Sequence, residues 1–298
     1  MNGVGTGPNG VTRRGFIGAV AVGMTGVGMG VEVGAEGRGR MHAAPTLRQS
    51  VCRWPFSDIP DDKFYPMVKR LGFGAVDLLT EREWPLAAEQ GLVCSMGTPT
   101  DRRDFIRTGL NDRANHPLVV GELERAIPAA RKAGVPNVIA MVGNRQGRND
   151  DAGLEACVEG LDRVKALAEE EGVTICLEML NSRVDHKDFM GDRTSFGLKL
   201  MYAVNSPRVR LLFDVYHMQI MEGDVIRTIR DHGHWIGHYH TAGNPGRNEL
   251  DQTQELNYAG IARAIADSGF TGWLAHEFVP TRSPEEGLRE ARVMCGGG

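Results

Sequence analysis

The chain has 298 residues, of which 41% are hydrophobic and 24% are charged, close to the composition of an ordinary globular protein. This composition excludes an intrinsically disordered chain, a coiled coil and a polytopic membrane protein. With 34 basic and 38 acidic side chains the formal net charge is −4. We therefore expect no nucleic acid among its partners, because nucleic-acid-binding domains usually carry a basic stripe.

The first 44 residues have the order of an export signal. Arg13-Arg14-Gly15-Phe16 is followed by an uncharged run from Ala19 to Val31 and then by small residues. Positive charge, a weakly apolar stretch and small residues form the usual order of a secretory signal, and the paired arginines resemble a twin-arginine signal. The run is too rich in glycine for a membrane anchor, since a spanning helix needs about 20 apolar residues. We predict a signal and flexible leader over residues 1–44 and an exported, periplasmic or otherwise extracytoplasmic protein without a stable membrane anchor. The alternative is a disordered tail whose arginines carry no meaning.

From Gln49 onward, short apolar runs alternate with longer amphipathic ones. The predicted strands are Ser50–Arg53, Ala75–Leu79, Leu92–Met96, Asn137–Val142, Val173–Leu180, Val209–Val215, Trp235–Thr241 and Trp273–Phe278. The predicted helices are Asp62–Leu71, Leu118–Ala133, Leu154–Glu171, Phe196–Val204, Val225–Asp231, Tyr258–Ser268 and Pro284–Met294. About eight βα units in about 250 residues predict a single α/β domain over residues 45–298, a (β/α)8 TIM barrel. A doubly wound sheet is the alternative, but no G-x-G-x-x-G follows the first strand.

Four polar side chains stand where predicted strands five to eight end. Glu178, Asp214, His240 and Glu277 each follow an apolar run, at intervals of about one βα unit. Because the reactive groups of such a barrel lie where strands finish and loops begin, we expect these side chains to converge on one rim. Taken singly, either glutamate could instead pair with an arginine, and His240 could be a satisfied interior histidine.

Three carboxylates in one cavity would raise one another's pKa values, whereas a divalent cation would hold all three ionised. Oxygen-rich ligation with one imidazole suits Mg²⁺ or Mn²⁺, with Co²⁺ and Zn²⁺ as alternatives. The sequence therefore predicts one divalent metal ion held by Glu178, Asp214, His240 and Glu277.

Four further residues are candidates for substrate binding. His217 lies three residues after Asp214, and Arg247 lies in a loop bounded by Pro and Gly, where it could hold a carboxylate or hydroxyl by two hydrogen bonds. His186 follows strand five, and Trp54 follows strand one as an apolar wall. The alternatives are a structural role for His217, an exposed loop arginine and a core tryptophan.

Several motifs carry a family resemblance. Cys176-Leu177-Glu178-Met179-Leu180-Asn181, Phe213-Asp214-Val215-Tyr216-His217, His238-Tyr239-His240 with Asn244-Pro245-Gly246-Arg247, and His276-Glu277 resemble the xylose isomerase-like sugar isomerase/epimerase superfamily, within it most the hydroxypyruvate isomerase branch. The resemblance covers the chain from Gln49 to about Val293.

The resemblance implies metal ligands at the same four positions and proton transfer by Glu178 and Glu277 as the catalytic pair. It also implies that His217 and Arg247 bind substrate oxygens. One departure is that hydroxypyruvate isomerases commonly carry glutamine where His240 stands, while ketose epimerases carry histidine. The export signal is a second departure, because such enzymes are usually cytoplasmic.

These features predict a metal-dependent isomerase that converts a small α-hydroxy carbonyl compound through an enediolate, such as hydroxypyruvate to tartronate semialdehyde. The expected partner is a small hydroxy-oxo acid or ketose, and the oligomeric state, including a homo-oligomer, stays open. One alternative is a ketose 3-epimerase. Another is an exported, non-catalytic sugar-binding barrel, although a binder does not need two opposed bases. An apurinic endonuclease of the same barrel type would need histidines at the ends of strands two and three, and none is present there.

Overall fold

The computed structural model describes residues 47–296. The predicted export signal, residues 1–44, lies outside this part of the chain. Within the described residues, no helix is long and apolar enough to cross a membrane.

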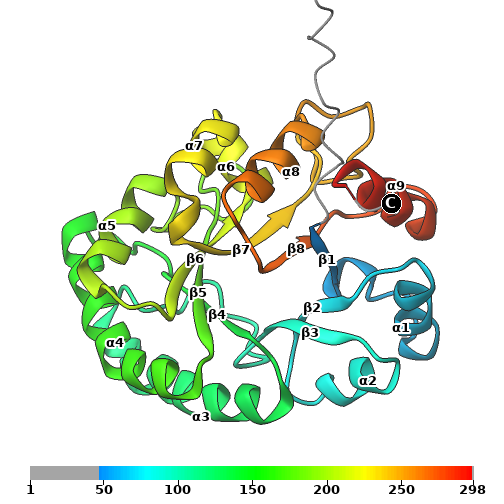
Figure 1. The fold of residues 1–298 in the computed structure, drawn as a ribbon. Helices are drawn as coiled ribbons and strands as arrows, with labels where there is room; N and C mark the ends of the chain where they lie inside the picture. Colours follow the sequence, from blue (N-terminus) through cyan, green and yellow to red (C-terminus); the bar gives the residue numbers. More distant parts are fainter. Residues whose placement is uncertain (1–46, 297–298) are drawn as a thin grey trace, which may run out of the picture. The chain divides into compact units, whose positions relative to one another are not determined.

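Eight parallel strands close into a barrel in chain order, with β8 paired to β1 (Figure 1). The predicted (β/α)8 barrel is therefore confirmed. The strands are β1 (Arg48–Cys52), β2 (Ala75–Leu79), β3 (Val93–Gly97), β4 (Asn137–Met141), β5 (Thr174–Met179), β6 (Val209–Asp214), β7 (Ile236–Thr241) and β8 (Trp273–His276).

Helices surround the strands on the outside of the barrel (Figure 1). Seven of them agree with the predicted helices within a few residues, but the sequence patterns predict neither α2 nor α6. Both are only one to two turns long, too short for a helical period to show. The helices are α1 (Asp61–Arg70), α2 (Trp84–Glu89), α3 (His116–Ala133), α4 (Asp150–Glu171), α5 (Thr194–Val204), α6 (Val215–Met221), α7 (Val225–His232), α8 (Tyr258–Asp267) and α9 (Pro284–Met294).

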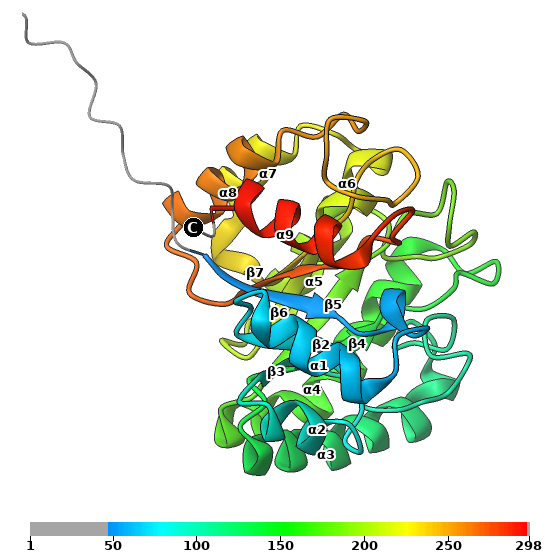
Figure 2. The same cartoon turned by 90° about the vertical axis from the view of Figure 1, so that its right-hand side faces the viewer.

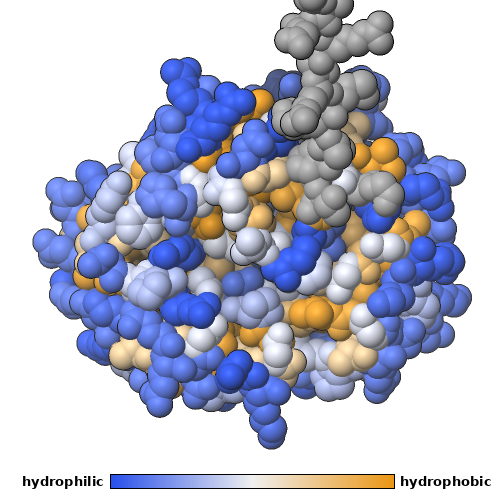
Figure 3. Space-filling model, in the orientation of Figure 1, coloured by the Kyte–Doolittle hydropathy of each residue, from blue (hydrophilic) through white to orange (hydrophobic). Residues whose placement is uncertain are grey.

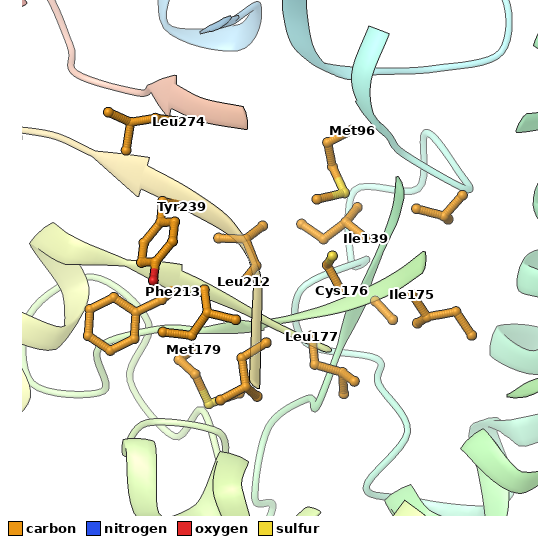
Figure 4. Packing of buried hydrophobic residues seen from close by; sticks show 14 of the residues in the cluster. Met96, Ile139, Ile175, Cys176, Leu177, Met179, Leu212, Phe213, Tyr239 and Leu274 are labelled. Carbon is orange, nitrogen blue, oxygen red and sulfur yellow. The ribbon is translucent and has the colours of Figure 1, made fainter. Parts of the chain in front are cut away.

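The strands are almost wholly buried because helices cover them on one side and the barrel interior on the other. Every residue of β4 is buried. In Figure 4, Met96, Ile139, Cys176 and Leu212 come from four strands and meet in the buried cluster. Figure 3 shows the complementary pattern on one face of the molecule, where hydrophilic side chains dominate the periphery formed by the helices.

Glycine residues end two of the long helices. Gly134 and Gly172 cap α3 and α4 with φ values of 74° and 69°, in the left-handed region that glycine adopts without steric cost. Each helix can then turn directly into the following strand.

The strand register brings polar groups to the carboxyl end of the barrel. Asp214 on β6 pairs with His240 on β7, and Glu178 on β5 pairs with Leu212 on β6. Paired residues of neighbouring parallel strands point to the same side, so Asp214 and His240 both point into the barrel. The loops that follow the strands gather at the right of Figure 2, the end to which the β1 arrow points.

Leu212 offers a test of this packing. Its side chain is fully buried, and the residue pairs in register with Glu178 on β5 and His238 on β7. Leu212→Ala should lower the free energy of unfolding by about 2–5 kcal/mol, because a cavity is left beneath the polar rim. Denaturant unfolding measures this change. Val293→Ala, at a site that is 63% exposed, should change it by less than about 0.5 kcal/mol. Equal losses in the two variants would contradict this account of the core.

Candidate active site

The four predicted metal ligands lie together at the carboxyl end of the barrel. Glu178 is near the end of β5, Asp214 ends β6, His240 is near the end of β7 and Glu277 directly follows β8. All four are buried, with at most 4% of any residue exposed. One ligand atom from each lies within 4.8 Å of those of the other three. The described residues thus include a group of side chains that could hold a metal ion.

Several polar atoms of this cluster have no hydrogen-bond partner among the described residues. They are Glu178 Oε1, Asp214 Oδ2 and His240 Nδ1. His240 Nδ1 lies 3.2 Å from Glu178 Oε1 and 3.0 Å from Glu277 Oε2. Buried polar groups are normally satisfied, since leaving one unpaired costs about 1–3 kcal/mol. Three unpaired atoms that face the same small volume, two of them carboxylate oxygens, have the donor chemistry that a divalent cation requires.

The charges of the cluster are poorly balanced without such an ion. Burial and the nearby Glu277 carboxylate raise the pKa of Asp214 to about 8. Burial also acts to raise the pKa of Glu277, but the Arg247 guanidinium and His240 outweigh it and hold that pKa well below its usual value. Two neighbouring carboxyl groups are therefore pushed in opposite directions. A cation among them would favour the ionised form of both.

Trp54 and Arg247 both bind Glu277. Trp54 Nε1 donates to Glu277 Oε1 at 2.6 Å, and Arg247 Nη2 donates to Glu277 Oε2 at 2.8 Å. The Arg247 guanidinium also lies 5.1 Å from the Trp54 ring centroid and 5.5 Å from that of Tyr216. Trp54, predicted as an apolar wall, is 42% exposed and acts as a hydrogen-bond donor as well. The two side chains fix the orientation of the Glu277 carboxylate.

The loop after β7 places Arg247 over the cluster. It contains a cis peptide bond between Asn244 and Pro245, and Gly246 and Arg247 have φ values of 96° and 58°. A left-handed conformation is uncommon for arginine, so the loop holds this residue in a conformation that its own backbone does not favour. Arg247 Nε is buried and has no partner among the described residues.

His217 is fixed as a hydrogen-bond donor toward the cluster. Its Nδ1 lies 2.6 Å from Nδ2 of Asn181, whose Oδ1 accepts two backbone N–H groups of the next turn. The amide nitrogen therefore donates to Nδ1, and the proton of a neutral imidazole stays on Nε2. Burial and the Arg247 charge lower the pKa of His217 well below its usual value, so the ring is neutral. Nε2 has no hydrogen-bond partner among the described residues and lies 3.7 Å from Asp214 Oδ2.

His186 completes the set of eight predicted residues. Its ring centroid lies 5.3 Å from that of His217. Burial lowers its pKa from the usual value. The structure thus brings all the sequence-predicted candidates to the same rim. A chain of contacts runs from Trp54 through Glu277, Arg247 and Asp214 to His217 and His186, and Glu178 and His240 lie beside Glu277 and Asp214.

Sequence reasoning missed the groups that lie beneath the cluster. Asp77, in the middle of β2, is fully buried, and its Oδ2 lies 2.9 Å from His240 Nε2 and 3.2 Å from His238 Nε2. Ser95 donates a hydrogen bond to Asp77 Oδ1. Two signals pointed there: a lone acid inside the apolar run Ala75–Leu79, and the i, i+2 spacing of two histidines on one strand, which places both on one face.

Comparison with known proteins identifies the family. Residues 67–294 match the family described as xylose isomerase-like TIM barrel. The chain belongs to this family.

The named relatives are isomerases. The chain is 29% identical over 204 residues to hydroxypyruvate isomerase of Escherichia coli, covering 68% of this chain and 72% of that protein. It is 25% identical over 263 residues to a putative hydroxypyruvate isomerase of Mus musculus, covering 82% and 94%. It is 31% identical over 177 residues to 2-oxo-tetronate isomerase of Cupriavidus necator, covering 59% and 67%. The fold and these relatives support an isomerase as the class of enzyme.

Solved structures agree on the fold. An AP endonuclease of family 2 from Brucella melitensis superposes with a TM-score of 0.74 at 23% identity, covering 82% of this chain and 97% of that one. A D-psicose 3-epimerase superposes with a TM-score of 0.68 at 17% identity, covering 84% and 100%. At these identities the similarity establishes the barrel alone.

Proposed function

We propose that this protein is a metal-dependent isomerase of small α-hydroxy carbonyl compounds, of the hydroxypyruvate isomerase type. The observation that carries the proposal is the convergence of Glu178, Asp214, His240 and Glu277, with three unpaired ligand atoms facing one another. The relatives named for hydroxypyruvate and 2-oxo-tetronate isomerisation support a short hydroxy-oxo acid as the substrate class.

Those four side chains would hold the metal, with Mg²⁺ or Mn²⁺ as the ions best suited to three carboxylates and one imidazole. When bound, a divalent ion polarises a carbonyl group and its neighbouring hydroxyl and so acidifies the C–H bond between them. The pairing of Glu277 with Arg247 and Trp54 supports a carboxylate that stays ionised and correctly oriented until it acts.

The chain's two glutamates would move the proton. One removes it from the carbon beside the carbonyl, and the other returns it. Return to the adjacent carbon moves the carbonyl group and gives an isomer, whereas return to the opposite face of the same carbon inverts that centre. His217 would donate from Nε2 to a substrate oxygen, and Arg247 would donate from its unpaired Nε. His186 and the exposed face of Trp54 would border the substrate.

Solvent exchange tests this function. Metal-free protein is reloaded with Mn²⁺ or Mg²⁺ and incubated in D₂O with hydroxypyruvate, related hydroxy-oxo acids and ketoses. We expect deuterium on the hydroxyl-bearing carbon next to the carbonyl group. We also expect a product whose carbonyl group has moved. An inverted centre would favour a 3-epimerase, which the histidine at position 240 also supports, and binding of sugars without exchange would identify a non-catalytic barrel.

Asn181 provides a prediction for substrate binding. Asn181→Asp would place a carboxylate against His217 Nδ1, draw the ring proton to that nitrogen and leave Nε2 as an acceptor. We expect KM for the substrate to rise about 10-fold with a smaller change in kcat, as measured by steady-state kinetics. Arg183→Gln should leave KM unchanged, because Arg183 is exposed in the same loop and donates to the Ile220 backbone carbonyl, away from His217. An unaltered KM in Asn181→Asp would contradict the donor role of His217.

Export of the protein is also part of the proposal, with residues 1–44 as the signal and residues 45–298 as the barrel domain. Fractionation of cells that express the full chain should recover it outside the cytoplasm. Replacement of Arg13 and Arg14 by lysine should retain it inside, and unchanged export in that variant would argue against the twin-arginine route.

A further inference from the structure

We propose that Asp77 is a positioning residue that sets which nitrogen of His240 faces the metal site. The inference rests on the proposed function and concerns a group two strands away from any proposed ligand. A neutral imidazole carries one proton, and only the other nitrogen can bind a metal. The side chain that decides where the proton lies therefore decides whether His240 can act as a ligand.

The contacts of His240 assign that proton. Its Nε2 lies 2.9 Å from Asp77 Oδ2. An ionised carboxylate only accepts hydrogen bonds, so Nε2 carries a hydrogen. With a cation at the site the ring would be neutral, and Nδ1 would then keep its lone pair. Nδ1 is the nitrogen that lies 3.2 Å from Glu178 Oε1 and 3.0 Å from Glu277 Oε2. A carboxylate behind a histidine in this manner fixes the ring's orientation and increases its basicity toward a metal.

The surroundings prevent Asp77 from turning away. Ser95 donates to its Oδ1, and His238 Nε2 lies 3.2 Å from its Oδ2. Asp77, Ser95, His238 and His240 are all fully buried inside the barrel, so water cannot take the place of any partner. Each oxygen of the carboxylate thus has a donor from another strand, and Asp77 can accept from His240 in only one geometry.

Metal affinity tests the proposal directly. Mn²⁺ is titrated into the metal-free protein and the free ion is followed by electron paramagnetic resonance. In Asp77→Asn an amide N–H₂ competes for the positions of the acceptor oxygens, so we expect the Kd for Mn²⁺ to rise about 10- to 100-fold. Electron spin echo modulation should show ¹⁴N coupling from the imidazole in the wild-type complex and a weaker coupling in the variant. His116→Gln is the control, because His116 is also a buried histidine but bonds the Leu110 carbonyl at the start of α3, outside the site, and this variant should bind Mn²⁺ as the wild type does.

Other outcomes separate the alternatives. An unchanged Kd and ¹⁴N coupling in Asp77→Asn, with only a loss of stability, would mean that Asp77 is structural and would overturn the proposal. Loss of Mn²⁺ binding in Asp77→Asn together with unchanged binding in Asp214→Asn would place the ion among Asp77, His238 and His240, which also lie within 4.8 Å of one another, and would overturn it as well. If the wild-type chain bound no Mn²⁺, the proposed function itself would fail.

A measurement on the wild type needs no variant to fold. In protein labelled with ¹⁵N-histidine and loaded with Mg²⁺, the His240 ring should carry its hydrogen on Nε2, as seen from the one-bond N–H coupling. A hydrogen on Nδ1 would contradict the proposal even where solvent exchange confirms the isomerase activity.

Discussion

Replacement of Glu277 by glutamine should reduce solvent exchange and turnover by about 10²- to 10⁴-fold, the usual contribution of a general acid or base. The physical reason is specific to this site. Trp54 Nε1 and Arg247 Nη2 both donate to the Glu277 carboxylate, and an amide can accept at only one of its two ends. The variant would lose the base and also turn one N–H₂ group toward a donor.

The measurement is deuterium incorporation by NMR, with substrate and metal in excess. Glu285→Gln is the matched control, because Glu285 is also paired with arginines, Arg70 and Arg289, but lies on the outer helix α9. We expect exchange in that variant at the wild-type rate. Full exchange in Glu277→Gln would remove Glu277 from the proton-transfer step and leave Glu178 as the remaining candidate.

Replacement of Asp214 by asparagine should abolish the thermal stabilisation of the protein by Mn²⁺. An ion that binds only the folded state adds about 2.7 kcal/mol at 100 times its Kd. For a domain of this size that gain raises Tm by about 5–10 °C. Asparagine removes one of the three carboxylates but still caps α6, since Asp214 Oδ1 accepts the His217 backbone N–H at 3.0 Å and asparagine caps equally well. The metal-free variant should therefore be no less stable than the wild type.

Differential scanning calorimetry with and without Mn²⁺ gives the comparison. Asp112→Asn is the control, because Asp112 also caps a helical turn, through the Ala114 backbone N–H, and lies outside the site. Its Mn²⁺-dependent rise in Tm should equal that of the wild type. If Asp214→Asn kept the full rise, the ion would bind elsewhere and the proposed ligand set would be wrong.

Much of the fold follows from the sequence because the barrel is regular. Strands such as β4 are buried throughout and follow a glycine that ends the preceding helix, so their positions can be predicted within one or two residues. The short helices escape this reasoning. Helix α6 begins directly after Asp214 with no loop residues between strand and helix, so its start is hidden in the apolar run of β6.

The candidate site can also be predicted from the sequence only in part. Side chains at strand ends converge in any closed parallel barrel, so Glu178, Asp214, His240 and Glu277 could be grouped from their spacing. Contacts across the barrel cannot be obtained in that way. The hydrogen bond between Asp77 on β2 and His240 on β7 depends on the shear and diameter of the closed sheet. The hydrogen bond between Trp54 and Glu277 depends on how β8 pairs with β1 to close the barrel.

The supporting hydrogen bonds have a consequence for dissection of the barrel. Every side chain proposed to hold the ion lies on β5, β6 or β7 or directly after β8. The residues that support them come from the first three βα units: Trp54 donates to Glu277, Asp77 accepts from His240, and Ser95 donates to Asp77. A fragment made of the carboxyl-terminal half would contain all four proposed metal ligands but none of these three supporting residues. Co-expression of the two halves as separate chains should restore function only when they reassemble, since neither half contains a complete centre.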